Sequence, residues 1–529
     1  MERSNLSLKQ KIGQLLMCGF PGTEPDAGIE GLIREGGLGG IIYFRRNLVE
    51  PAQAAALSAK LQEYAAEGSG VPLLIAIDQE GGMVTRIERG VSVMPGAMAL
   101  GATGDADAAY QAARVTAAEL RAMGINMNFA PVLDVNNNPL NPVIGVRSYG
   151  GDADLVSRLG TAAVRGCQEE GVAATVKHFP GHGDTAQDSH HELPSVPHAR
   201  ERLDRLELAP FREAIRQGVD AVMTAHLLFP AVEPERLPAT LSPRVLTGLL
   251  REELGYEGVI VTDCLEMNAI AKHYGVGEGA VLAVEAGADL VLVSHRLELQ
   301  QSALNALIAA VENGRLTEER IDRSVDRLLA LKARRAAHAA ARAAVPQPGS
   351  TLATEASLAL AERIGEASIT LVAGELQPLE RGKRVLVIWP EVRVGSEVDE
   401  VLGRKESLGY WLAQLGFAVR EERIGVQPTA EERERVLALA REGGQAVAIS
   451  YNAALEPKQA ELIRELAGVP ELRLTVASVR IPSDLSVLGR VPVYLACYEN
   501  TPFAMKALAR VLGGELPAAG ILPAPIQID

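Results

Sequence analysis

The sequence predicts an α/β fold in which a (β/α)8-type TIM barrel is followed by a smaller α/β sandwich domain. Short apolar segments alternate with amphipathic ones along the first 340 residues, a pattern typical of parallel strands joined by helices. Polar residues stand at the end of nearly every apolar segment, and a barrel brings all these ends to one face, where active sites lie. A doubly wound sheet has the same alternation, but it would gather such residues mainly at one switch point.

The strands of the barrel are expected to be buried on both faces, because their apolar residues are consecutive rather than alternating. Seven segments have this character: 39–44, 73–78, 125–134, 173–179, 220–229, 258–265 and 288–294. The polar residues at their ends are Asp78, Asp134, Lys177, His178, His226, Asp263 and Ser294. Helices are expected between the strands. One of them is predicted to have Ser242 as its N-cap, Pro243 at its first position and Gly255 at its end.

A second domain is expected after an Ala- and Arg-rich helix that runs into a linker containing Pro346 and Pro348. Four more apolar segments follow, again with helices between them: 384–390, 445–450, 474–479 and 491–498. The predicted division is a catalytic barrel over 1–340, a linker over 341–352 and a sandwich domain over 353–529.

Composition excludes several classes of function. The net charge of −15 argues against a broad contact with nucleic acid or with an anionic membrane, since either requires a basic surface. Only 20 of 529 residues are aromatic, so a compact polar site is expected rather than a long groove for a polymer. Four scattered cysteines without a CxxC pair indicate neither a disulfide framework nor a zinc ribbon. The N-terminus lacks the pattern of a signal peptide and no apolar run could span a membrane, so a cytoplasmic location is expected.

The chemistry is concentrated in residues 177–191, which contain four of the nine histidines. A zinc site is one interpretation, because His178 and His182 have i,i+4 spacing, but Pro180 and Gly181 argue against the helix that this spacing requires. A second interpretation is a polar loop whose histidines cap backbone groups. The third is acid/base catalysis by His190 with Asp188, because i,i+2 spacing places both side chains on one side of an extended segment.

Three further residues each have two interpretations. Asp263 directly follows a buried strand and is either the N-cap of the next helix or a nucleophile aimed into the barrel mouth. Asp78 is either a ligand for sugar hydroxyls or the partner of Arg86 in an ion pair. Arg147 is either a ligand donor or part of a surface or interdomain salt bridge. A nucleophilic Asp263 and a proton shuttle at Asp188 and His190 are together what double-displacement glycosyl transfer needs.

Several motifs of the first domain resemble family 3 glycoside hydrolases, in the β-N-acetylglucosaminidase branch. They are KHFPGHGDTAQDSH, VTDCLEM, DQEGG with Arg86, APVLDVN, and MTAHLLFP followed by PATLS. The resemblance covers about residues 8–335 closely. The C-terminal part is similar to that family's α/β sandwich domain more loosely, through TVASVRIPSDL, YENTPFAMKAL and GELPAAGILPAPI.

The resemblance implies a role for each matching residue. Asp263 matches the nucleophile, and His190 matches the general acid/base, which Asp188 supports. The positions that match substrate-binding residues are Asp78, Arg86, Arg147, Lys177 and His178, and Met267 is expected to line the site. One position departs from the pattern, because many relatives carry Arg where this chain has Met83.

The implied activity is that of a retaining β-N-acetylglucosaminidase on small glycans such as muropeptides or chitooligosaccharides, with no cofactor and no metal. A β-N-acetylglucosaminide phosphorylase and a β-glucosidase of the same fold are the near alternatives. A neutral imidazole base repels an anionic acceptor less than a carboxylate does, so phosphate could take the place of water. A non-catalytic binding module and a metalloenzyme are the alternatives from other classes.

Overall fold

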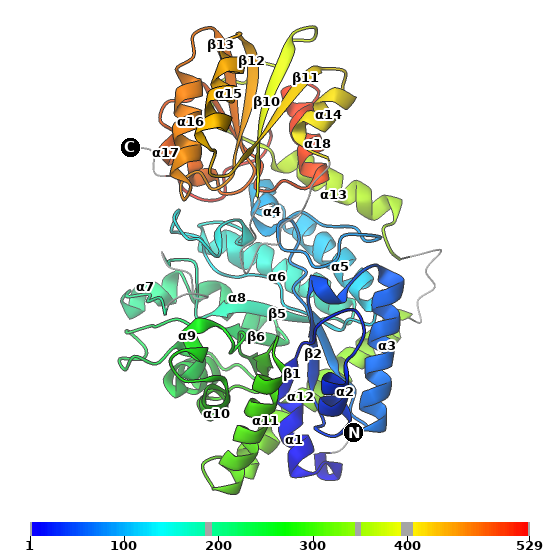
Figure 1. The fold of residues 1–529 in the computed structure, drawn as a ribbon. Coiled ribbons are helices and arrows are strands. Elements are labelled where there is room, and N and C mark those ends of the chain that lie inside the picture. The colour runs from blue at the N-terminus through cyan, green and yellow to red at the C-terminus, as the bar shows by residue number, and fades with distance from the viewer. Residues whose placement is uncertain (1–2, 186–192, 344–350, 393–405, 527–529) are drawn as a thin grey trace.

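A computed structural model describes residues 3–185, 193–343, 351–392 and 406–526. Asp188 and His190 therefore lie outside the described residues. Figure 1 shows a barrel surrounded by helices, with a second sheet and its helices stacked on one side of it. The predicted fold class is confirmed.

Eight parallel strands form the first sheet, in the order β7-β6-β5-β4-β3-β2-β1-β8. A parallel bridge between Val261 and Leu290 joins the two outer strands, so the sheet closes on itself. The strands are β1 Leu16–Cys18, β2 Gly40–Tyr43, β3 Leu74–Ile77, β4 Met127–Asn128, β5 Ala173–Phe179, β6 Ala221–Thr224, β7 Val259–Val261 and β8 Val291–Val293. Every residue in them is buried, as the consecutive apolar segments predicted. The first strand was not predicted.

Helices cover the outside of the barrel. They are α1 Leu8–Gln14, α2 Ala27–Arg34, α3 Pro51–Glu67, α4 Ala97–Thr103, α5 Ala106–Ala122, α6 Ala153–Glu169, α7 Arg200–Arg205, α8 Ala209–Arg216, η5 Arg244–Glu253, α9 Asn268–Ala271, α10 Val276–Ala286, α11 Leu297–Glu312 and α12 Glu318–Ala343. The helix predicted after Ser242 is η5, whose hydrogen bonds are mostly of the wide π type. The hydroxyl of Ser242 accepts the N–H of Val245 at 3.2 Å, and Gly255 has a φ of +66° just past the helix, as predicted.

The second sheet has the order β11-β10-β12-β13-β14-β9, in which only β9 is antiparallel to its neighbour. Its elements are α13 Glu355–Ser368, β9 Thr370–Gly374, β10 Arg384–Glu391, α14 Leu408–Gln414, β11 Ala418–Gly425, α15 Ala430–Ala440, β12 Gly444–Ser450, α16 Pro457–Ala467, β13 Leu472–Ser478, α17 Leu485–Leu488, β14 Val493–Ala496 and α18 Pro502–Leu512. Alternate residues of β10 enter two separate apolar clusters, Val387 on one face and Ile388 on the other, so helices pack on both faces of this sheet.

The barrel and the second sheet share an apolar cluster. It joins Met98, Ala99, Ala102 and Val146 of the barrel part to Ile481, Ala496, Tyr498 and Ala524. Helix α12 ends at Ala343 and α13 begins at Glu355, while residues 344–350 lie outside the described residues. The division at 340 and 353 stays a prediction.

The four cysteines are buried thiols without a disulfide bond. None of the helices in the described parts of the chain combines the length and the apolar character that a bilayer crossing requires.

Candidate active site

A cavity of about 840 Å3 opens where the barrel strands end. Seven of the nine predicted site residues line it: Asp78, Arg86, Arg147, Lys177, His178, Asp263 and Met267. The other two, Asp188 and His190, are outside the described residues. The structure thus brings together side chains that are up to 189 positions apart in the sequence, from Asp78 to Met267.

Strand ends position most of these side chains. Asp78 directly follows β3, Lys177 and His178 are near the end of β5, and Asp263 comes two residues after β7. Because parallel strands of a closed barrel end at one rim, each of these side chains reaches the same cavity.

Asp263 is half-buried, and its Oδ1 accepts the N–H of Cys264 at 2.7 Å. The next helix, α9, begins only at Asn268 and has Met267 at its N-cap position. Asp263 is therefore not the N-cap of that helix, and this alternative is wrong. Its side chain lines the cavity instead.

Asp78 forms an ion pair with Arg86, one of the two interpretations that the sequence left open, and its role as a ligand for sugar hydroxyls stays a prediction. Its Oδ1 is 2.8 Å from Lys177 Nζ, and its Oδ2 is 3.8 Å from Arg86 Nη2. The carboxylate also lines the cavity, with 18% of its side chain exposed. A carboxylate held between two cations has a fixed orientation and still offers oxygen atoms to a ligand.

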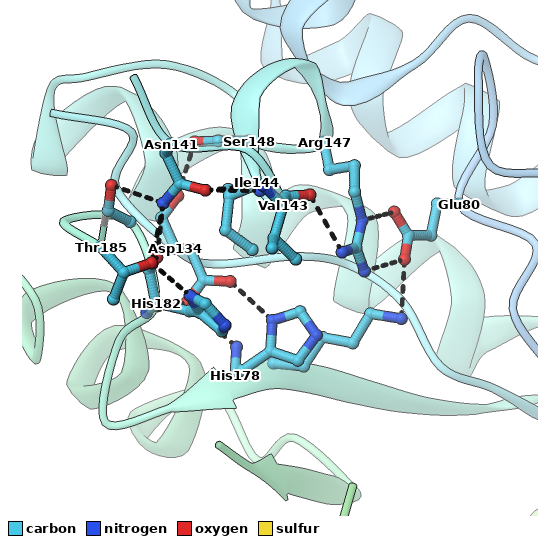
Figure 2. A network of polar contacts seen from close by, with 12 residues as sticks. Glu80, Asp134, Asn141, Val143, Ile144, Arg147, Ser148, His178, His182 and Thr185 are labelled. Atoms are coloured by element: carbon cyan, nitrogen blue, oxygen red, sulfur yellow. Dashed lines mark hydrogen bonds and ion pairs between the residues drawn. The ribbon is translucent and has the colours of Figure 1, made fainter. Parts of the chain in front are cut away.

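Glu80 joins Arg147 to Lys177 and was not predicted from the sequence. Figure 2 shows its side chain facing Arg147, with contacts of 3.0 Å to Nε and 2.7 Å to Nη2. Lys177 Nζ lies 2.7 Å from the same carboxylate. Burial alone would raise the pKa of Glu80, but the charges of Arg147 and Lys177 outweigh it and hold the pKa well below its usual range. The salt bridge of Arg147 thus lies within the barrel, and a surface or interdomain bridge is wrong.

Asp134 binds the end of β5 and the loop that follows it. Its Oδ1 accepts the backbone N–H of His178 at 3.1 Å and of His182 at 2.7 Å, and its Oδ2 is 2.7 Å from His178 Nδ1 (Figure 2). Burial raises the pKa of Asp134, but the contacts with His178 and His182 together outweigh burial and lower it. Because Nδ1 of His178 is engaged by Asp134, Nε2 is the ring nitrogen that can meet a ligand.

His182 does not share a helix with His178, although the zinc interpretation of their i,i+4 spacing requires one. Its Nδ1 is 2.9 Å from Thr185 Oγ1, and burial together with His178 lowers its pKa to about 4, so the ring is neutral at pH 7. Residues 180–185 contain no helix. Both imidazoles contact protein side chains through Nδ1, His178 with Asp134 and His182 with Thr185.

A second group with possible metal ligands lies among the described residues but outside the cavity lining. Asp184, His198 and Glu207 have ligand atoms within 4.8 Å of one another. The guanidinium of Arg202 lies between the two carboxylates, with Nη2 at 2.7 Å from Asp184 and 3.3 Å from Glu207. A cation of the protein itself therefore occupies this position.

The mouth of the cavity carries residues that the sequence did not single out. Phe44 packs against His295 with ring centroids 4.9 Å apart, and the guanidinium of Arg46 lies 4.3 Å from the Phe44 ring. Glu266 accepts the N–H of His295 at 2.6 Å and pairs with Arg296 at 2.9 Å. Glu266 belongs to VTDCLEM, three positions after Asp263, which was the available signal.

The chain belongs to glycosyl hydrolase family 3, because the family model described as "Glycosyl hydrolase family 3 N terminal domain" matches residues 7–331. The resemblance predicted from the motifs is confirmed, and the chain is a glycoside hydrolase.

Similar proteins carry related names. A solved β-N-acetylglucosaminidase of this family from Paenibacillus sp. str. FPU-7 is 66% identical, with a TM-score of 0.95 over 99% of this chain and 100% of that one. "Beta-hexosaminidase A" of Pseudoalteromonas piscicida is 37% identical over 68% of this chain, and this chain spans 64% of its length. "Beta-N-acetylglucosaminidase/beta-glucosidase" of Cellulomonas fimi is 31% identical over 97% of this chain and 93% of its own.

Proposed function

We propose that this protein is a retaining β-N-acetylglucosaminidase that removes non-reducing terminal N-acetylglucosamine from small glycans through a covalent glycosyl-enzyme. The observation that carries the proposal is the cavity at the strand ends, which Asp263 shares with Asp78, Lys177, Arg147 and His178. The names of the Paenibacillus and Pseudoalteromonas relatives support the choice of sugar.

The first half of the proposed reaction forms the covalent intermediate. The Asp263 carboxylate attacks the anomeric carbon, while His190, protonated and oriented by Asp188, gives its proton to the leaving oxygen. The bond from the anomeric carbon to that oxygen breaks as the bond to Asp263 forms. The half-buried position of Asp263 next to a fixed backbone N–H supports this role.

The second half releases the sugar. Neutral His190 takes a proton from water, the water oxygen bonds to the anomeric carbon, and the bond to Asp263 breaks. Two inversions at one carbon leave the product in the β configuration. No metal or cofactor takes part in this scheme.

Charged side chains on the opposite wall are proposed to hold the sugar. Asp78 and Lys177 present an acceptor and a donor for hydroxyl groups, and Arg86, Arg147 and His178 add donors around them. Met267 adds an apolar surface to the cavity lining. A cavity of about 840 Å3 suits a small glycan, in keeping with the low aromatic content.

The test compares wild type, Asp263→Asn and a control, Asp107→Asn, on p-nitrophenyl β-N-acetylglucosaminide. Asp107 is exposed on α5, so its substitution should leave the rate unchanged. Loss of a nucleophile is expected to lower kcat by about a thousandfold or more. If Asp263→Asn retains wild-type turnover, Asp263 is not the nucleophile.

Product analysis separates the alternatives. NMR of the first product should show the β anomer, and an α anomer would contradict the double displacement. Sugar 1-phosphate as the main product in phosphate buffer would replace hydrolysis with phosphorolysis. Higher kcat/KM on the p-nitrophenyl β-glucoside than on the N-acetylglucosaminide would favour the β-glucosidase alternative.

A further inference from the structure

We propose that Glu499, which lies three residues after β14 of the second sheet, is a positioning residue that acts through Glu80 on Arg147 and Lys177. The inference rests on the proposed function, because it assigns Arg147 and Lys177 to substrate binding. Through Glu499, the second domain would influence a cavity whose lining residues all come from the barrel part.

Glu499 reaches across the boundary to a turn of the barrel part. Its side chain is 1% exposed, and its Oε2 accepts the N–H of Gly96 at 3.3 Å. A Cβ atom placed on Gly82 would lie only 2.5 Å from the same oxygen. The carboxylate therefore fills the place that a side chain at position 82 would take.

The turn that Glu499 contacts carries Glu80. The N–H groups of Glu80 and Gly81 donate to Val84 O at 3.0 and 3.2 Å. Gly81 and Gly82 have φ values of +97° and +56°, so neither has a side chain that could hold the turn by packing. Backbone hydrogen bonds therefore hold the turn from within, and Glu499 adds a contact from the second domain at Gly82 and Gly96.

The backbone before Glu499 is itself unusual. Tyr498 has a φ of +65°, a left-handed conformation that a bulky residue rarely adopts. The ring is buried in the apolar cluster shared by the two parts, and its hydroxyl donates to Thr370 Oγ1 at 2.7 Å. Strained residues persist where their surroundings hold them and often lie next to functional sites. Here the strained residue directly precedes the side chain that crosses to the barrel.

The second domain also contacts the loop that carries Arg147. Val146 packs in the shared cluster with Ile481 and Tyr498, and the N–H of Gly151 donates to Pro523 O at 3.0 Å. Both segments that present the Glu80–Arg147 pair are thus held from the same side. A small cleft lined by Glu80, Gly81, Gly96, Arg147 and Glu499 marks where these contacts meet.

The test compares the wild-type full chain with four variants: Glu499→Ala, Glu499→Gln, Glu80→Gln, and the double variant that combines Glu80→Gln with Glu499→Ala. Glu465→Ala is the control, since Glu465 pairs with Arg433 on the far helices of the second domain. Glu499→Ala is expected to raise KM on the N-acetylglucosaminide about tenfold, because displaced binding groups lose affinity, with kcat within about threefold. Glu499→Gln keeps an oxygen acceptor for Gly96 and should restore most of the affinity.

The double variant tests whether the effect passes through Glu80. In the Glu80→Gln background, Glu499→Ala is expected to change KM by less than about twofold, because the route is already broken. Fully multiplicative effects of the two substitutions would overturn the proposal. So would an unchanged KM in Glu499→Ala, or a KM that rises equally in Glu465→Ala.

Hydrogen–deuterium exchange gives a readout that does not depend on activity. Glu499→Ala should speed exchange in residues 79–96, and Glu499→Gln and Glu465→Ala should not. Unchanged exchange in Glu499→Ala would refute the positioning role even if the enzyme acts on another sugar. A wild type without activity on N-acetylglucosaminides would instead refute the proposed function.

Discussion

Replacing Glu80 with Gln removes one negative charge from a buried cluster that contains two cations. The side chains of Glu80 and Arg147 are each 7% exposed and that of Lys177 is 2% exposed, so little water reaches the place of the lost partner. After the substitution, Lys177 keeps its contact of 2.8 Å with Asp78, but Arg147 loses both of its contacts with a carboxylate. Removing one partner of a buried ion pair costs about 3–5 kcal/mol of unfolding free energy.

Thermal unfolding followed by far-UV circular dichroism measures this loss. The barrel part has roughly 340 residues and an unfolding entropy of about 0.7 kcal/mol per kelvin, so the predicted loss corresponds to a fall in Tm of about 4–7 °C. The control is Glu278→Gln, which breaks an exposed pair with Arg315 and should cost no more than about 1 kcal/mol. Both tryptophans, Trp389 and Trp411, lie in the second domain, so fluorescence follows that domain separately. If Glu80→Gln lowers Tm no more than Glu278→Gln does, the buried contacts of Glu80 do not stabilise the fold as predicted.

The pH dependence of this difference has a definite sign. The pKa of Glu80 is lower in the folded state than its ordinary value of 4.5. Its stabilising contribution is therefore complete above pH 4.5 and is lost as the pH falls toward the folded pKa. The gap in Tm between wild type and Glu80→Gln should be constant from pH 5 to 8 and narrow only in more acidic solution.

Two other substitutions probe the barrel. Burial lowers the pKa of Lys332 to about 7, so its charge destabilises the folded protein below pH 7, and this cost falls as the pH rises from 7 toward 10.5. Lys332→Met should therefore raise Tm at pH 7 and raise it less at pH 9. An increase in Tm that is as large at pH 9 as at pH 7 would contradict the lowered pKa. A Cβ atom on Gly183 would overlap a backbone carbonyl oxygen, so Gly183→Ala is expected to lower the free energy of unfolding by about 1–3 kcal/mol. Gly248 has an open helical position, so Gly248→Ala should leave the stability unchanged or raise it. Equal Tm values for these two variants would contradict the overlap at Gly183.

The fold could be predicted where apolar residues are consecutive. Seven of the eight barrel strands stand out because each is buried on both faces, but β1 follows α1 after one residue and its apolar residues merge with those of the helix. In the second sheet, β11 was missed because its sequence, AVREERIG, is largely charged, as suits a strand at an edge. The short β9, at the other edge, was missed as well.

The candidate site was predictable where a polar residue ends a strand. This rule selected Asp78, Lys177, His178 and Asp263, all of which line the cavity. It could not select Glu80, because its importance comes from two cations that lie 67 and 97 residues away in the sequence. Side chains that follow β2 and β8, such as Phe44 and His295, have no pattern of their own and meet only when the barrel closes.

The most direct test of the account is mass spectrometry of the protein after reaction with 5-fluoro-N-acetylglucosaminyl fluoride. The fluorine at C5 slows both steps by disfavouring positive charge on the sugar ring, and the fluoride leaving group lets the first step proceed, so a covalent intermediate accumulates. If Asp263 is the nucleophile, one glycosyl adduct is expected on the peptide that contains Asp263, and none in Asp263→Asn. An adduct on any other carboxylate would contradict it.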